Sequence, residues 1–143
     1  RMETLILSNN RLLGGVPRSL GTLERLRLLM LDGNQLSGAI PEELGNCTNL
    51  EELIIDMRLH GNSFSGSIPP SVGNLSKLSI LYLSNNKLDG SIPATLGQLR
   101  RLTQVDFSEN QLTGGIPGSL AKCDSLQLLD LSSNLLSGEI PAS

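Results

Sequence analysis

The stretch Leu78–Arg101, LSILYLSNNKLDGSIPATLGQLRR, decides the fold of this 143-residue chain. Near its start, Leu81 and Leu83 alternate with other residues, which predicts a short strand with both leucines pointing inward. Asn86 follows where the chain must turn, and an asparagine side chain can bond neighbouring backbone groups. This part of the stretch therefore predicts a strand followed by a turn.

The remainder of the stretch predicts a kink and then one helical turn. Gly90 permits an unusual backbone dihedral angle, and Pro93 removes a backbone donor and stops any long strand. Residues 94–99 are too few for an independent helix but suit one tight helical turn. Together these pieces make one coil of a spiral whose leucines face its axis.

The same text recurs along the whole chain. Prolines that follow Val or Ile are 24, 28, 24, 24 and 24 residues apart. A fixed period in this range signals a solenoid, in which each coil packs only on its neighbours. These prolines are Pro17, Pro41, Pro69, Pro93, Pro117 and Pro141. A matching series of asparagines consists of Asn10, Asn34, Asn62, Asn86, Asn110 and Asn134.

The asparagine series is predicted to form a structural ladder. Stacked at one point of each coil, the amides can satisfy backbone groups of the next coil, as buried polar groups require. The alternative, that these residues act only as turn formers, explains each asparagine but does not explain their fixed register.

The repeated pattern LxxLxLxxNxLxGxIPxxLGxLxx resembles the plant-specific class of leucine-rich repeat over the whole chain. The resemblance implies an α/β solenoid: a right-handed superhelix with a parallel β-sheet on its concave face and short 3-10 or helical turns on its convex face. We expect one domain over residues 1–143 without terminal caps. Its six repeats are predicted at about residues 2–25, 26–49, 50–77, 78–101, 102–125 and, truncated, 126–143.

The third repeat carries four extra residues, and two alignments satisfy the pattern. In the first, the text LEEL continues as RLHGN and residues 54–57 form the insertion. In the second, LEELIID continues directly to Gly61 and Asn62, and residues 57–60 form the insertion. Either way the extra residues lie on or beside the strand, as a tolerated bulge or as a binding loop.

Composition excludes several classes of protein. The net charge is −3 and the chain has no tryptophan, and neither a basic stripe nor an aromatic platform marks a nucleic-acid partner. No apolar run reaches membrane-spanning length and no signal peptide is present, so we expect no membrane contact by this segment. The chain begins at Arg1 inside a coil, which suggests a piece of something longer or an engineered chain. No cofactor is expected.

The two cysteines, Cys47 and Cys123, occupy the same slot three coils apart. At about 4.8 Å per coil they would lie roughly 14 Å apart, too far for a disulfide. We expect two small buried residues in the interior of the spiral.

Residues that flank the inward leucines form the candidate ligand-binding surface on the concave face. Its N-terminal half is apolar and its C-terminal half is acidic, which suits an extended peptide that carries a basic group. In the third coil, the first alignment places Arg58 and His60 on this surface, and the second alignment places Ile54 and Asp56 there instead. The candidate ligand-binding residues are Met30, Asp32, Arg58, His60, Tyr82, Asp106 and Asp130.

Catalysis and metal binding are not expected. His60 is the only histidine, and no recognisable motif pairs it with a serine or cysteine. Asp106 and Asp130 are predicted neighbours whose carboxylates could raise each other's pKa, but nothing else marks a substrate pocket. A metal at Asp32, Asp56 and His60 would lack a complete set of ligands.

Two N-glycosylation sequons are present, Asn46-Cys47-Thr48 and Asn74-Leu75-Ser76. Both lie in the same slot of the repeat, just before the next coil opens. With the family resemblance, they favour an extracellular or cell-surface protein.

The resemblance implies a ligand-recognition segment of a receptor-like kinase or receptor-like protein ectodomain, with a peptide, a protein or a co-receptor ectodomain as partner. Two alternatives are a soluble extracellular inhibitor of cell-wall hydrolases and a structural or ice-binding solenoid. Self-association is also expected, because both ends lack a covering coil. The leucine-slot residues exposed there are predicted to be Leu5, Leu7, Leu129, Leu131 and Ile140.

Overall fold

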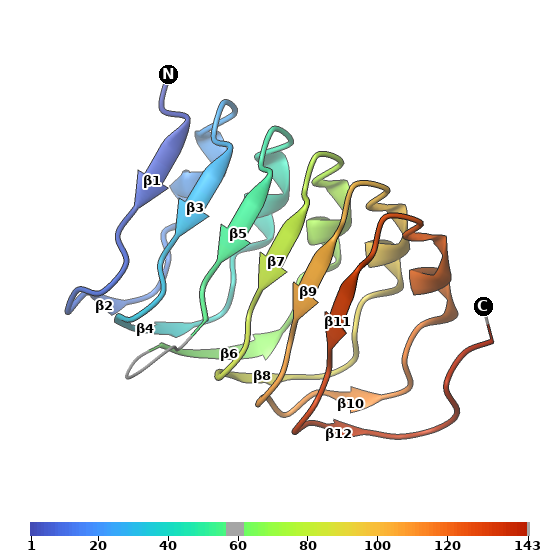
Figure 1. Ribbon diagram of the computed structural model, residues 1–143. Coiled ribbons are helices and arrows are strands. Elements are labelled where there is room, and N and C mark those ends of the chain that lie inside the picture. The colour runs from blue at the N-terminus through green and yellow to red at the C-terminus, as the bar shows by residue number, and fades with distance from the viewer. Residues whose placement is uncertain (57–61, 143) are drawn as a thin grey trace.

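The computed structural model describes residues 1–56 and 62–142, and these residues form a solenoid (Figure 1). One face, which we call the strand face, is a six-stranded parallel sheet in the order β1-β3-β5-β7-β9-β11. The 3-10 helices lie behind it on the helix face. The strands are β1 (Thr4–Ile6), β3 (Leu28–Met30), β5 (Glu52–Ile54), β7 (Ile80–Tyr82), β9 (Gln104–Asp106) and β11 (Leu128–Asp130). The helices are η1 (Arg18–Thr22), η2 (Glu42–Asn46), η3 (Pro70–Asn74), η4 (Ala94–Gln98) and η5 (Gly118–Lys122).

The strand and the helical turn predicted from Leu78–Arg101 are both present. Leu81 and Leu83 are completely buried, so the alternating pattern correctly identified the inward side chains. Pro93 precedes η4 in an extended conformation, with φ −65° and ψ 128°, because its ring fixes φ near this value. The helix ends after five residues, where the N–H of Leu99 bonds the carbonyl of Leu96.

A second line of short strands forms one edge of the solenoid and was not predicted. Gly90 has a φ of +69°, which confirms the expected kink. The neighbouring residues Lys87–Asp89 form a strand that pairs with the preceding coil. Their own sequence does not predict this strand. These strands are β2 (Leu13–Gly14), β4 (Gln35–Gly38), β6 (Ser63–Ser67) and β8 (Lys87–Asp89), which form one sheet, and the pair β10 (Thr113–Gly114) and β12 (Leu135–Leu136).

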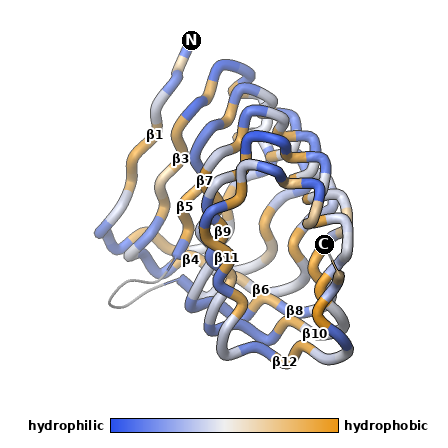
Figure 2. Tube along the Cα trace, turned by 45° about the vertical axis from the view of Figure 1, so that its right-hand side comes forward, coloured by the Kyte–Doolittle hydropathy of each residue, from blue (hydrophilic) through white to orange (hydrophobic). Residues whose placement is uncertain are grey.

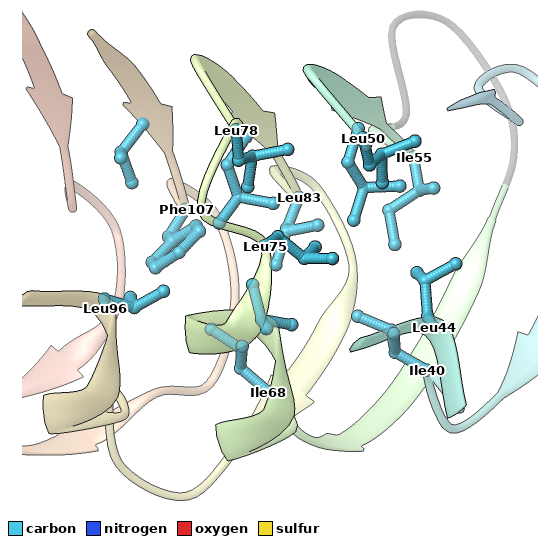
Figure 3. Packing of buried hydrophobic residues seen from close by; sticks show 14 of the residues in the cluster. Ile40, Leu44, Leu50, Ile55, Ile68, Leu75, Leu78, Leu83, Leu96 and Phe107 are labelled. Atoms are coloured by element: carbon cyan, nitrogen blue, oxygen red, sulfur yellow. The ribbon is translucent and has the colours of Figure 1, made fainter. Parts of the chain in front are cut away.

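The core is a continuous stack of side chains between the strand face and the helix face. Apolar and polar segments alternate along every coil (Figure 2), as expected for a chain that returns to the core in each repeat. Leu50, Leu75, Leu78 and Phe107 are completely buried, and Figure 3 shows them among the packed side chains of the interior. Burial of each such side chain contributes about 1.5–3 kcal/mol relative to exposure.

The asparagine ladder is present, with one correction to its direction. The Nδ2 atom of Asn86 donates to the carbonyl oxygens of Leu83 (3.2 Å) and Ser84 (3.1 Å) in its own coil and of Ile55 (3.1 Å) in the coil before. Its Oδ1 atom accepts from the N–H of Phe64 at 3.0 Å. The amide therefore joins each coil to the preceding coil, whereas we predicted the next one.

The other asparagines of the series repeat this arrangement where a preceding coil is present. Asn34, Asn62, Asn110 and Asn134 each donate to the coil before and accept a backbone N–H from it. Asn10 is exposed and bonds only Leu7 and Ser8 of its own coil.

The third coil follows the second of the two predicted alignments. Ile54 pairs in register with Met30 and Tyr82, and Ile55 is 2% exposed and points into the core (Figure 3). Residues 54–57 are therefore not the insertion, because 54 and 55 are part of the strand and the core. By register the four extra residues are 57–60, which lie outside the described residues together with Gly61.

The two cysteines lie in the core as free thiols, as predicted. The Sγ atom of Cys47 lies 3.5 Å from the carbonyl oxygen of Leu20, and that of Cys123 lies 3.4 Å from the carbonyl oxygen of Leu96. Burial raises the pKa of both thiols. Each cysteine thus serves as a small core residue that also contacts the preceding coil.

Candidate recognition surface

The strand face carries a central column of side chains, one from each strand. The register of the sheet aligns these positions from β1 to β11, which confirms the predicted order of the column with Ile54 in place of Arg58. Arg58 and His60 lie outside the described residues. The central column consists of Ile6, Met30, Ile54, Tyr82, Asp106 and Asp130.

The N-terminal part of this column is apolar. Ile6 is 54% exposed, Met30 and Tyr82 are partly exposed, and Ile54 between them is only 8% exposed. Leu28 and Ile80, on the same strands as Met30 and Tyr82, are partly exposed and widen this strip, whereas Glu52 between them in register is charged.

Tyr82 lies where the apolar part of the column meets its polar part. Its hydroxyl group donates a hydrogen bond to the side-chain oxygen of Gln104 on the next strand. The bond satisfies the polar end of the tyrosine, which is partly exposed.

The C-terminal part of the column is acidic. The Oδ1 atom of Asp106 accepts from the N–H and hydroxyl of Ser108, at 3.0 and 2.6 Å. Asp130 accepts in the same way from Ser132, at 2.9 and 2.6 Å. These serines fix the direction of both carboxylates.

The pKa of Asp130 moves in the opposite direction from the prediction. The two hydrogen bonds from Ser132 lower it, because they stabilise the charged form. The expectation that Asp106 would raise it is therefore wrong, although the two residues are partners in register on adjacent strands. Asp130 remains ionised at neutral pH.

Asp32, predicted as a contact residue, is only 6% exposed. Its Oδ1 atom accepts a hydrogen bond of 2.5 Å from the hydroxyl group of Ser8 in the preceding coil. Asp56 and Ser84, at the equivalent position of the next two coils, are also buried. The structure therefore gives Asp32 a role in joining coils and does not bring it to the open surface.

A polar hollow of about 310 Å³, which the sequence analysis missed, lies at the edge of the solenoid where the strands begin. The guanidinium group of Arg27 binds both carboxylate oxygens of Glu51 at 3.0 Å, which lowers the pKa of Glu51. The signal was the alternating charge of Glu3, Arg27 and Glu51 in one slot of the repeat. The hollow is lined by Glu3, Arg25, Arg27, Asn49, Glu51 and Lys77.

Residues 1–56 and 62–142 contain neither a metal-binding cluster nor a membrane-spanning helix. No group of three or more His, Cys, Asp or Glu side chains there is arranged to hold a metal ion. The helices of this part of the chain are too short to cross a membrane.

Comparison with known proteins identifies the repeats. Leucine rich repeat families match residues 1–23, 25–47 and 49–75, and also residues 76–136. No protein in a search of curated sequences matches the chain.

Similar solved structures are ectodomains of plant receptor kinases. The ectodomain of GASSHO1/SCHENGEN3 from Arabidopsis thaliana, in complex with CASPARIAN STRIP INTEGRITY FACTOR 2, is 43% identical with a TM-score of 0.92, over 98% of this chain and 16% of that chain. The ectodomain of the Arabidopsis receptor kinase HAESA, in complex with an N-terminal extended IDA peptide hormone ligand, is 41% identical with a TM-score of 0.89. The match covers 95% of this chain and 22% of that chain.

A shorter ectodomain aligns over more of its own length. That of the receptor kinase SOBIR1 from Arabidopsis thaliana is 37% identical with a TM-score of 0.83, over 96% of this chain and 73% of that chain. The chain thus spans less than a quarter of the GASSHO1/SCHENGEN3 and HAESA ectodomains and most of the SOBIR1 ectodomain. It belongs to the leucine-rich repeat family and matches a part of a plant leucine-rich repeat receptor kinase ectodomain.

Proposed function

We propose that the chain is a non-catalytic recognition module that binds an extended peptide, or an extended segment of a protein, on its strand face. The observation that carries this proposal is the central column, in which an apolar strip from Ile6 to Tyr82 runs directly into the carboxylates of Asp106 and Asp130. Such a surface offers contact area at one end and charge at the other.

The two ends of the column suit different residues of one ligand. Met30 and Tyr82 can pack against apolar side chains, since aromatic and methionine residues are favoured at the centres of interfaces. The oriented carboxylates of Asp106 and Asp130 can receive a lysine or arginine, with charge-assisted hydrogen bonds. The proposed ligand therefore has apolar residues and a basic residue on the same extended segment.

The similar structures support this proposal. The ectodomain of GASSHO1/SCHENGEN3 was solved in complex with CASPARIAN STRIP INTEGRITY FACTOR 2, and that of HAESA in complex with a peptide hormone ligand. A further similar structure is a complex of two plant proteins, BIR3 and SERK2. By analogy we propose an extracellular location and, as a second kind of partner, a co-receptor ectodomain.

Selection from a random-peptide display library tests the proposal. The immobilised 1–143 chain should enrich peptides in which apolar residues accompany a lysine or arginine. The Tyr82→Ala variant should lose the apolar preference, and the Asp106→Asn/Asp130→Asn variant should lose the basic preference.

The control is Asp124→Asn, which removes an exposed carboxylate outside the central column. It should enrich the same peptides as the wild type. If the wild type enriches no family of peptides, or if all variants enrich the same family, the strand face is not the recognition surface.

A further inference from the structure

We infer that Asn46 and Asn74 both carry N-linked glycans, and that the pair covers the edge of the solenoid between the helix face and the start of the strands. This inference rests on the extracellular location proposed above. The two residues are the last residues of η2 and η3 and are exposed. They are also the only asparagines of the chain in Asn-Xaa-Ser/Thr sequons.

Hydrogen bonding distinguishes these two asparagines from those of the ladder. Each ladder asparagine uses its Nδ2 atom to bond backbone carbonyl groups, as Asn86 does at 3.1–3.2 Å. Among the described residues, the amides of Asn46 and Asn74 make no side-chain hydrogen bond, and neither do the hydroxyl groups of Thr48 and Ser76. The groups that a sequon requires are thus not used by the fold.

The backbone of the repeat places each sequon with its first and third residues outward. Cys47 has φ −77° and ψ 59°, and Leu75 has φ −78° and ψ 65°, which are the angles of an inverse γ-turn. Both of these middle residues are completely buried, whereas the residues on either side of them are exposed. A sugar on the asparagine therefore extends into solvent without disturbing the core.

The modification is a group transfer that leaves oxidation states unchanged. The Nδ2 atom of the asparagine forms a bond to C1 of the first sugar of an oligosaccharide. The bond between C1 and the pyrophosphate oxygen of a lipid-linked donor breaks, and the lipid pyrophosphate leaves with the electron pair. One Nδ2 proton is released to a base, so that the product is a neutral glycosyl amide.

The two glycans would stand side by side. Helices η2 and η3 belong to adjacent coils and pack so closely that a Cβ atom on Gly45 would lie 2.5 Å from the carbonyl oxygen of Ser71. Asn49 and Lys77, three residues after the two sequon asparagines, line the polar hollow at the same edge. The glycans therefore shield this edge and leave the strand face and the edge formed by β2, β4, β6 and β8 to protein partners.

Glycan occupancy is measured on the 1–143 chain produced with a cleavable secretory leader in plant or insect cells. Intact mass before and after an enzyme that removes Asn-linked glycans should show two occupied sites. Asn46→Gln and Thr48→Ala should each remove one glycan, and Asn74→Gln and Ser76→Ala should each remove the other. Asn49→Gln, a neighbour outside any sequon, should keep both.

A variant with an additional sequon tests whether the end of a 3-10 helix in this repeat is accessible to glycosylation. The double change Gln98→Asn/Arg100→Thr creates a sequon at the end of η4 and should add a third glycan. A secreted wild-type chain with no glycan, or with only one, would overturn the inference. Peptide selection on bacterially produced chain, which has no glycans, tests the proposed function separately.

Discussion

At the residue scale, stability depends on amides that connect neighbouring coils. Asn86 is 8% exposed and makes four hydrogen bonds to backbone groups, two of which are to the preceding coil. Loss of such a side chain leaves buried backbone groups without partners, which costs more than loss of an exposed bond. Asn10 makes only bonds within its own exposed coil.

We therefore expect Asn86→Ala to lower the free energy of unfolding by about 1–3 kcal/mol, and Asn10→Ala to lower it by clearly less. Urea unfolding followed by circular dichroism measures both. Equal shifts for the two variants would contradict the ladder as a bridge between coils.

The buried thiols predict a pH dependence. The pKa of each thiol is raised in the folded state by burial, so folding favours the protonated form. This contribution is fully present below the unfolded-state pKa of about 8.5 and is lost as the pH rises through the folded-state value.

Unfolding free energies of the wild type and of Cys47→Ala/Cys123→Ala, measured from pH 7 upward, should therefore converge as the pH rises above about 8.5. Titration of the denatured wild type without reductant should also find two free thiols. A constant difference between the two proteins at all pH values would argue against burial of the thiols.

At the scale of the element, the third coil shows how a solenoid accommodates additional residues. Its strand and core positions are regular through Asp56, and regular pairing resumes at Asn62. The Nδ2 atom of Asn62 lies 3.5 Å from the carbonyl oxygen of Ile55, whereas Asn34 bonds Leu31 at 3.0 Å. The bond within the coil is thus longer in the coil that carries the extra residues.

Deletion of residues 57–60 should keep or raise the melting temperature, because it joins Asp56 to Gly61 and Asn62 as Asp32 is joined to Gly33 and Asn34. The comparison variant, deletion of residues 54–57, removes the end of β5 and the buried Ile55 and leaves the text LEELRLHGN, which also satisfies the repeat pattern. It should fold with a lower melting temperature than the first deletion, because Arg58 and Leu59 then stand where Ile54 and Ile55 pack in the native coil. Thermal melts compare the two deletion variants. If deletion of residues 57–60 gave the lower melting temperature of the two, the register assigned to the third coil would be wrong. The peptide selection described above, repeated on the shortened chain, shows whether the extra residues contribute to binding.

At the scale of the whole molecule, the two ends differ from the middle. Leu129 is 38% exposed, whereas Leu53 and Leu81 at the same slot of inner coils are completely buried. At the other end an apolar hollow of about 230 Å³ is lined by leucines that include Leu5, Leu7 and Leu13. Each end presents the same leucine slots that join adjacent coils.

We predict that the isolated 1–143 chain associates end to end as its concentration rises, since the apolar end of one copy can cover that of another. Sedimentation velocity should show a concentration-dependent shift that Leu135→Glu/Ile140→Glu reduces. These residues are 66% and 87% exposed, so the variant should retain the fold. A monomer at every concentration would rule out this mode of assembly.

The amino-acid sequence by itself determined the repeating coil, its inward leucines, the asparagine series and the buried cysteines. These features follow from local pattern and from a period that every coil shares, so that each copy supports the interpretation of the others. The apolar-to-acidic order of the central column was also predictable, because the register of a repeat places equivalent residues next to each other.

Only the tertiary structure decided which residues of the third coil are extra, because both alignments satisfy the pattern and Ile55 is assigned to the core by packing alone. The same holds for the strands at the second edge, for the burial of Asp32 against Ser8 and for the ion pair of Arg27 with Glu51. Each depends on contact between residues of adjacent coils that are more than 20 positions apart, which local sequence pattern does not encode.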